Sequence, residues 1–303
     1  LRTTLVSVLG QDYHDLEVIV VDDASRPPAD IVAAGFDDQR LRVVRNTTPQ
    51  GVSAARNRGI AEAAGEWVAF LDDDDVWAPD KLSRQLQAAR DADAAWAYAG
   101  DVIVDRNLRI LFGGPPPSPA DVMAWLSRFN PVTSGGSNVL VRADVLAQVG
   151  GFDPRLRRTE DWDLWLRLGR HGPPAWVRAP LVAYRFHPAN VAADVSGMVE
   201  EALRLRRRHR IPVDLAAMHR RAAWTALRNG RRLLAAYHYL RAVLRGDVRS
   251  IARMGVAVVH PAVGTDRLFG LLPSSPESQA WAEAAQGWLR QLARGDTPPD
   301  EPA

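Results

Sequence analysis

The stretch Phe70-Leu71-Asp72-Asp73-Asp74-Asp75-Val76-Trp77 organises this sequence. An apolar run of strand length, Trp67 to Leu71, leads into four consecutive carboxylates with no basic residue among them. A hard divalent cation such as Mg²⁺ or Mn²⁺ would relieve their repulsion, because it binds carboxylate oxygens and keeps positions open for phosphate oxygens. The alternative is a solvated acidic turn in which Asp80 or an earlier aspartate caps the helix that begins near Lys81.

The composition fits one α/β domain of ordinary size with an appended region. The chain has 303 residues, of which 47% are hydrophobic and 24% charged, and its formal net charge is +2. It contains no cysteine, which excludes disulfides, zinc thiolate sites and thiol nucleophiles. Lys81 is the only lysine, and no Walker A phosphate loop is present. No segment has the features of a signal peptide, and no apolar run reaches ~18 residues, so we expect a cytoplasmic protein.

Strand and helix patterns alternate along the first third of the chain. The apolar run Leu16 to Val21 predicts a strand that ends in Asp22-Asp23, and Leu41 to Val44 predicts a second strand. The segment Gly51 to Ala64 then predicts a helix, and Trp67 to Leu71 predicts the next strand. This order is typical of a parallel sheet covered on both faces. Ligands of such sheets bind outside the carboxyl ends of the strands, so we expect both aspartate clusters to face one crevice.

The rest of the chain predicts a second set of strands and then helices. Strands are expected at 94–99, 102–104, 109–112, 139–142 and 175–186, and a helix that opens at 159–161. From about residue 194 the composition shifts to Ala, Arg and Leu, which predicts helices at 195–209, 214–229, 231–244, 249–258 and 277–294. We therefore expect a domain over residues 1–193, a helical region over 194–294 and a disordered tail over 295–303.

Five segments together resemble a known family. They are Glu17-Val18-Ile19-Val20-Val21-Asp22-Asp23-Ala24-Ser25, the Gly51–Gly59 segment with Ala55-Arg56-Asn57, Phe70–Trp77, Gly150–Asp153 and Glu160-Asp161-Trp162-Asp163. In order and spacing they resemble family 2 glycosyltransferases over roughly residues 1 to 190. The resemblance implies the GT-A fold, an α/β, Rossmann-like and mostly parallel sheet. It also implies metal-dependent transfer of a sugar from a nucleotide-diphosphate donor to an acceptor hydroxyl with inversion, in cell-envelope or other glycan biosynthesis.

The resemblance assigns residues to the donor and to the metal. The donor set is Asp22, Asp23, Arg56, Asp72 and Asp73, and the metal set is Asp74 with Asp72 and Asp75. The nucleobase edge would be read by the aspartates after the first predicted strand, and Arg56 would lie against the donor, where a guanidinium suits phosphate. Mg²⁺ or Mn²⁺ would neutralise the leaving diphosphate as a Lewis acid.

The resemblance also implies a catalytic base. Asp161 would remove the proton from the acceptor hydroxyl, and Glu160 and His187 are further candidates for the site. A UDP-sugar is the favoured donor, and a glycan or lipid-linked molecule the expected acceptor. The run Arg204–Arg210 could rest on anionic lipid at the inner face of the membrane, or could be a solvated helix face, and no nucleic-acid motif accompanies it.

One feature departs from the family pattern. Members of the family begin with a strand that precedes the helix with which this chain starts, so the resemblance implies that the first strand of the fold is missing here. Two interpretations of function therefore remain open. The protein is either a transferase or a non-catalytic sugar-nucleotide-binding or scaffold protein that retains the GT-A fold.

Overall fold

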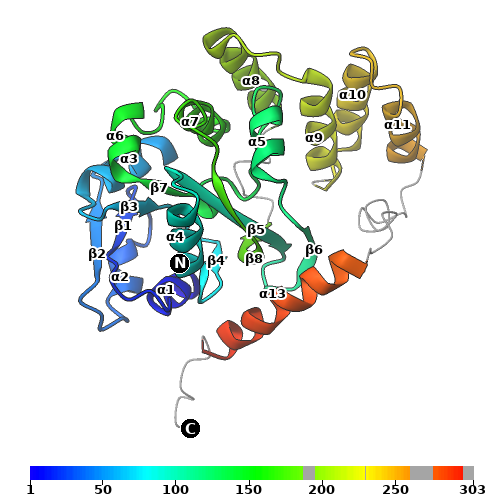
Figure 1. The fold of residues 1–303 in the computed structure, drawn as a ribbon. Coiled ribbons are helices and arrows are strands. Elements are labelled where there is room, and N and C mark those ends of the chain that lie inside the picture. The colour runs from blue at the N-terminus through cyan, green and yellow to red at the C-terminus, as the bar shows by residue number, and fades with distance from the viewer. Residues whose placement is uncertain (187–194, 229, 260–275, 296–303) are drawn as a thin grey trace. The chain divides into compact units, whose positions relative to one another are not determined.

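The chain divides into two compact units, shown in Figure 1. The computed structural model describes residues 1–186, 195–228, 230–259 and 276–295. Unit 1 comprises Leu1–Met123, Pro131–Phe186 and the described part of Pro276–Ala303, and unit 2 comprises Ala124–Asn130 and the described part of His187–Ser275. The predicted tail lies almost entirely outside the described residues.

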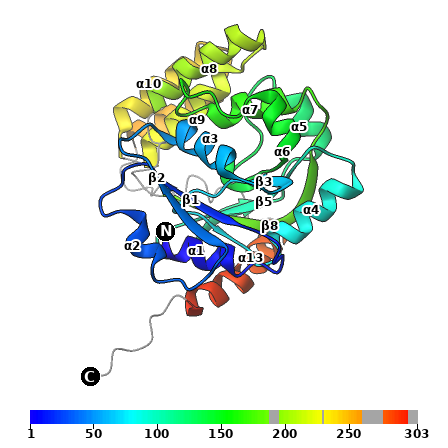
Figure 2. The same ribbon diagram turned by 90° about the vertical axis from the view of Figure 1, so that its left-hand side faces the viewer.

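Unit 1 begins with a parallel strand pair flanked by helices. Its elements are α1 (Arg2–Leu9), β1 (Val18–Asp22), α2 (Ala29–Ala33), β2 (Leu41–Arg45) and α3 (Val52–Glu62). β1 and β2 pair in parallel with Val18 opposite Leu41. Figure 2 shows α1 and α2 on one side of this pair and α3 on the other. The apolar runs of the two strands are thus covered on both faces, as the alternating sequence pattern predicted.

The larger sheet of unit 1 is mixed. Its strands are β3 (Trp67–Ala69), β4 (Val76–Trp77), β5 (Trp96–Val104), β6 (Ile110–Gly114), β7 (Leu140–Arg142) and β8 (Ala175–Arg185). They follow the order β3-β7-β5-β8-β4, with β6 on β5. Only β5 and β8 pair in parallel in this sheet. The expectation of a mostly parallel sheet is corrected here, because the short strands β4, β6 and β7 join their neighbours antiparallel and need no helical crossover.

Two strands differ from the sequence prediction. The predicted strands at 94–99 and 102–104 form one strand, β5, and its register against β8 shifts on both sides of Gly100. The two residues after Asp75, which the sequence analysis left outside any strand, form β4 and pair with β8. Their burial explains this, since Val76 and Trp77 are 0% and 3% exposed. The aspartate turn is therefore anchored by a strand at each end.

The helices of unit 1 cover this sheet. They are α4 (Lys81–Asp91), α5 (Pro119–Trp125, which extends two residues beyond the unit), the 3₁₀ helix η1 (Gly135–Asn138), α6 (Ala143–Val149), α7 (Glu160–Leu168) and α13 (Pro276–Gly295). Leu5 and Val8 of α1 share a buried cluster with Trp77, Leu82 and Val182. This cluster holds the turn after β3 between α1, α4 and β8.

The helix α13 belongs to the sheet domain. The sequence analysis grouped residues 277–294 with the other C-terminal helices, whereas the structure packs α13 on unit 1. The Trp281 indole donates to the Asp101 carbonyl oxygen at 2.9 Å, and the Trp288 indole donates to that of Pro180 at 3.0 Å. Gly100 makes room for this contact, because a Cβ there would lie 2.1 Å from the Trp281 ring.

Unit 2 is helical, as the sequence predicted. Its elements are α8 (Val195–His209), α9 (Leu215–Arg228), α10 (Arg232–Val243) and α11 (Ser250–Val259). α9 and α10 form a hairpin that turns at Gly230, whose φ of +70° favours glycine. Ala223, Ala226, Ala235 and Tyr239 pack in its core. Within the described ranges, no helix combines the length and the hydropathy that crossing a membrane requires.

Candidate active site

The aspartate turn is held from both sides by backbone hydrogen bonds. The N–H of Asp75 donates to the carbonyl oxygen of Asp72 at 3.1 Å, which closes the turn. The N–H of Asp72 donates to Oγ of Ser137 at 3.0 Å, and Oγ1 of Thr4 donates to the carbonyl oxygen of Asp73 at 2.8 Å. Because the backbone is fixed in this way, the four carboxylates that follow β3 stay clustered despite their repulsion.

Asp75 is the buried member of this cluster. Its side chain accepts a hydrogen bond from the N–H of Arg185 at 2.9 Å, and its Oδ2 atom has no hydrogen-bond partner among the described residues. Burial raises the pKa of Asp75 well above its usual range, and the neighbouring carboxylates of Asp72 and Asp74 raise it further. A buried carboxyl with a free oxygen is suited to a proton or to a cation.

Arg56 links the aspartate turn to a second acidic segment. Its guanidinium donates to Asp72 at 2.6 Å and to Glu160 at 3.0 Å, and only 11% of the side chain is exposed. The ring of Phe152 lies under the guanidinium, with 5.2 Å between the ring centroid and the Cζ atom of Arg56. Burial alone would lower the pKa of Arg56, but the carboxylates of Asp72 and Glu160 outweigh it and raise the pKa. Gly136 leaves space for Arg56, since a Cβ there would lie 3.1 Å from its Cζ atom.

Glu160 and Asp161 begin helix α7 beside Arg56. Glu160 is 8% exposed, and burial together with the adjacent Asp161 raises its pKa to about 7, although Arg56 opposes the shift. The Asp161 carboxylate accepts the N–H of Trp162 at 2.6 Å. A Cβ on Gly135 would lie 3.3 Å from Oδ2 of Asp161, so the loop at η1 covers this carboxylate closely. Asp72, Arg56, Glu160 and Asp161 therefore form one site.

Asp22 and Asp23 serve the loops around β1 in this structure. Asp22 accepts the N–H groups of Ser25 and Ala29 at 2.7 and 2.9 Å and pairs with Arg45. Burial would raise its pKa, but these hydrogen bonds and Arg45 lower it to about 2. Asp23 accepts the Nδ2 group of Asn46 at 2.7 Å.

Asp23 also holds the beginning of α3. Its carboxylate accepts the N–H groups of Gln50 at 2.9 Å and of Gly51 at 2.7 Å, and these bonds lower its pKa although burial opposes them. Since α3 carries Arg56, the first aspartate pair is tied to the site through this helix. A shared crevice for both aspartate clusters stays a prediction.

Comparison with known proteins relates part of this chain to a family. Residues 1–129 match the family model described as "Glycosyl transferase family 2". Over this segment the chain is similar to family 2. The matched residues include β1, α3 and the aspartate turn, but the family 2 model ends before α7, which carries Glu160 and Asp161.

Curated relatives of this chain are named as glycosyltransferases. An uncharacterized glycosyltransferase of Rickettsia typhi is 26% identical over 206 residues, which are 66% of this chain and 64% of that protein. A putative teichuronic acid biosynthesis glycosyltransferase, TuaG of Bacillus subtilis, is 28% identical over 61% of this chain and 73% of its own length. The Escherichia coli enzyme WfgD, a UDP-Glc:alpha-D-GlcNAc-diphosphoundecaprenol beta-1,3-glucosyltransferase, is 31% identical over 35% of this chain and 42% of its own.

The match covers only part of several relatives. It spans 34% of one glycosyltransferase of Rickettsia felis and 30% of another of Rickettsia bellii.

Solved structures share the fold of this chain. The chain is 17% identical to Staphylococcus aureus TarS in complex with UDP-GlcNAc, with a TM-score of 0.52 over 84% of this chain and 82% of that one. The chain is also 19% identical to the mannosyltransferase PcManGT of Pyrobaculum calidifontis in complex with GDP-Man and Mn²⁺. That comparison has a TM-score of 0.50 and covers 97% of this chain and 81% of that one. The fold is therefore GT-A, as the resemblance implied.

The carboxylates of this site fit a divalent cation that is shared with phosphate. Their oxygens are hard donors, and the buried Oδ2 atom of Asp75 has no partner among the described residues. No three His, Asp or Glu side chains in the described parts of the chain are placed to hold a metal by themselves. Mg²⁺ is usually bound through one or two carboxylates and substrate phosphates, which agrees with such a site. His187, a further candidate, lies outside the described residues.

The sequence analysis missed two supports of this site. Ser137 is fully buried, binds the N–H of Asp72, and accepts the indole N–H of Trp77 on its carbonyl oxygen at 2.8 Å. Asp101 accepts the hydroxyl of Ser134, which has a left-handed backbone with φ of 59° next to Gly135. The only signal in the sequence was the glycine-rich segment 134–138, which the pattern did not distinguish from an ordinary turn.

Proposed function

We propose that this chain transfers a sugar from a nucleotide-diphosphate donor to an acceptor hydroxyl by a single displacement with inversion. The observation that carries the proposal is the bridge through Arg56, which binds Asp72 at 2.6 Å and Glu160 at 3.0 Å. It brings the aspartate turn of a family 2 segment next to Asp161. A donor-binding carboxylate and a candidate base thus lie in one site.

In the proposed reaction Asp161 takes the proton from the acceptor hydroxyl while its oxygen attacks the anomeric carbon. The bond from that carbon to the diphosphate breaks, and its electron pair leaves with the diphosphate oxygen. A general base of this kind contributes roughly 10²–10⁴-fold to the rate. With one base and no covalent intermediate on the protein, the sugar is inverted.

The donor would be held by the aspartate turn and α3. Asp74 with Asp72 and Asp75 would hold Mg²⁺ or Mn²⁺, which when bound supplies Lewis-acid neutralisation of the diphosphate. Arg56 keeps Asp72 oriented, and its guanidinium lies next to the expected diphosphate position. Asp22 and Asp23 would read the nucleobase through the atoms that their internal hydrogen bonds leave available, and Asp72 and Asp73 would contact the donor.

A lipid-linked acceptor and a UDP-sugar are part of the proposal. They are supported by one relative, WfgD, whose name includes UDP-Glc and a diphosphoundecaprenol acceptor, and by the likeness to TarS, which was solved in complex with UDP-GlcNAc. The exposed arginines at the end of α8 would contact anionic lipid at the inner face of the membrane. If vesicles containing phosphatidylglycerol fail to retain the protein at low salt, this membrane contact is wrong.

The test of the function uses thermal unfolding and turnover. Thermal stability would be measured with UDP-, GDP- and dTDP-sugars, with and without Mn²⁺, because a ligand that binds the folded state raises its stability. Asp74→Ala should remove the metal-dependent increase. Asp161→Asn should keep donor binding and lower donor hydrolysis or transfer by at least about 100-fold. Asp144→Asn is the matched control, because Asp144 is also in the first turn of a helix but is 57% exposed.

Two results would contradict the proposal. If Asp161→Asn turns over at the parent rate, Asp161 is not the base. If the parent binds a sugar nucleotide with Mn²⁺ but shows no turnover with any acceptor or with water, the chain is a sugar-nucleotide-binding protein that retains the fold.

A further inference from the structure

Unit 2 is strongly basic, although the whole chain is nearly neutral. Residues 195–259 contain fourteen arginines and four acidic residues, whereas the net charge of the chain is +2. The positive charge is therefore concentrated on the helical unit. A local excess of this size attracts anions unless carboxylates neutralise it.

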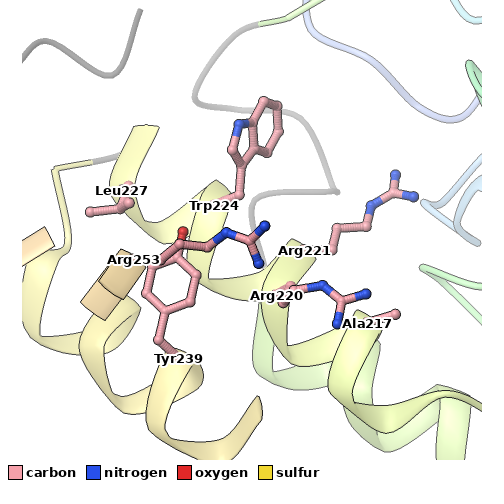
Figure 3. A pocket seen from close by; sticks show the side chains of 7 residues that line it. All are labelled: Ala217, Arg220, Arg221, Trp224, Leu227, Tyr239 and Arg253. Carbon is pink, nitrogen blue, oxygen red and sulfur yellow. The ribbon is translucent and has the colours of Figure 1, made fainter. Parts of the chain in front are cut away.

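A cavity in this unit is lined by part of that charge. It has a volume of about 340 Å³ and lies among α9, α10 and α11. Seven residues line it: Ala217, Arg220, Arg221, Trp224, Leu227, Tyr239 and Arg253. Figure 3 shows these side chains around the cavity. Two of the three arginines and the indole ring come from α9, and the third arginine, Arg253, comes from α11. This volume is within the range of small-molecule sites, about 300–1,000 Å³.

The charges at the cavity do not balance. Asp247 pairs with Arg220 at 3.0 Å and with Arg253 at 3.6 Å, and it also accepts the hydroxyl of Ser250 at 2.6 Å. Arg221 has no ion-pair partner among the described residues and is exposed. Two of the three guanidinium groups at the cavity thus share one carboxylate and the third is unpaired within the described part of the chain, which leaves an excess of two positive charges. A ligand with about two negative charges would complete the site.

The remaining lining is apolar and aromatic. Tyr239 is only 4% exposed and belongs to the hydrophobic cluster of the α9–α10 hairpin, against which Leu227 packs. Trp224 adds an indole ring to the same wall. Such a surface favours a ligand with an apolar part beside its anionic group, because burying apolar area contributes about 25 cal/mol per Å².

We propose that this cavity binds the phosphate or diphosphate group of an organic ester, with Arg221 and Arg253 on the anion and Trp224 and Tyr239 on the apolar part. The binding does not depend on the proposed transfer reaction. Two sources share this chemistry: a lipid-linked diphosphate and a free nucleotide. The apolar walls favour the lipid-linked source.

The test measures binding to the full chain by isothermal titration calorimetry. The probes are inorganic pyrophosphate, UDP and farnesyl diphosphate, each with EDTA and in the Asp74→Ala background, so that the donor site of unit 1 does not contribute. The cavity variant is Arg221→Gln with Arg253→Gln. Arg231→Gln with Arg249→Gln is the matched control, because it removes the same charge from exposed positions of unit 2 outside the cavity.

We expect farnesyl diphosphate to bind the parent and the control, and to bind the cavity variant at least about tenfold more weakly. Tighter binding of farnesyl diphosphate than of UDP assigns the site to a lipid-linked ligand, and the reverse order assigns it to a nucleotide. If none of the three probes binds, or if the cavity variant and the control bind equally well, the proposal is overturned. A circular dichroism melt of each variant excludes unfolding as the cause.

Discussion

Replacing Glu160 by glutamine should change the pH dependence of stability in a defined direction. Glu160 is 8% exposed, and burial with the nearby Asp161 raises its pKa from 4.5 to about 7. An acid whose pKa is higher in the folded state holds its proton there while the unfolded chain has lost it. The parent therefore loses stability as the pH rises from about 4.5 to about 7.

The size of the effect follows from the two pKa values. The pKa of Glu160 is 4.5 in the unfolded chain and about 7 in the folded one. Its ionisation therefore lowers the free energy of unfolding of the parent by about 2.5 kcal/mol more near pH 8 than near pH 5. Glutamine does not ionise and keeps a carbonyl oxygen for Arg56. The stability of Glu160→Gln relative to the parent should therefore increase by about this amount between the two conditions.

The assay is urea unfolding followed by tryptophan fluorescence near pH 5 and near pH 8. Glu66→Gln is the control, since Glu66 is exposed and makes no described side-chain hydrogen bond. Its stability relative to the parent should vary little with pH. If Glu160→Gln shows the same stability difference from the parent at both pH values, the burial argument for the site is refuted.

Two further predictions concern packing and a second buried titratable pair. Gly100→Ala should lower the free energy of unfolding by about 1–3 kcal/mol in urea unfolding, because the new Cβ would lie 2.1 Å from the Trp281 ring. Gly114→Ala is the control and should be neutral, because a Cβ at that position has no neighbouring atom within 4 Å among the described residues. His219 and His238 contact through their Nδ1 atoms at 3.0 Å, and burial lowers both pKa values, that of His219 to about 4. The free energy of unfolding should therefore fall as the pH drops from 6.5 toward 4, and the double variant His219→Phe with His238→Phe should show a smaller fall. If the double variant loses as much stability as the parent over this pH range, the two histidines are not the cause.

The sequence predicted most elements because their signals are local. Apolar runs predicted β1, β2, β3 and β8, and helical periodicity predicted the helices of unit 2 to within one or two residues. The cluster Asp72–Asp75 and the pair Glu160-Asp161 were found from their residue types and their resemblance to a family. The strand β4 was missed, since two residues are too short for a periodic signal.

The sequence by itself determined which residues carry charge in this protein and which segments are apolar enough to form strands and helices. Only the tertiary structure decided that Arg56 neutralises Asp72 and Glu160, which lie 16 and 104 residues from it along the chain. It also decided that α13 packs on the sheet through Trp281 and that Arg220 and Arg253 of unit 2 share Asp247. The physical reason is that ion pairs and close packing depend on distances in space, which a local sequence pattern does not encode.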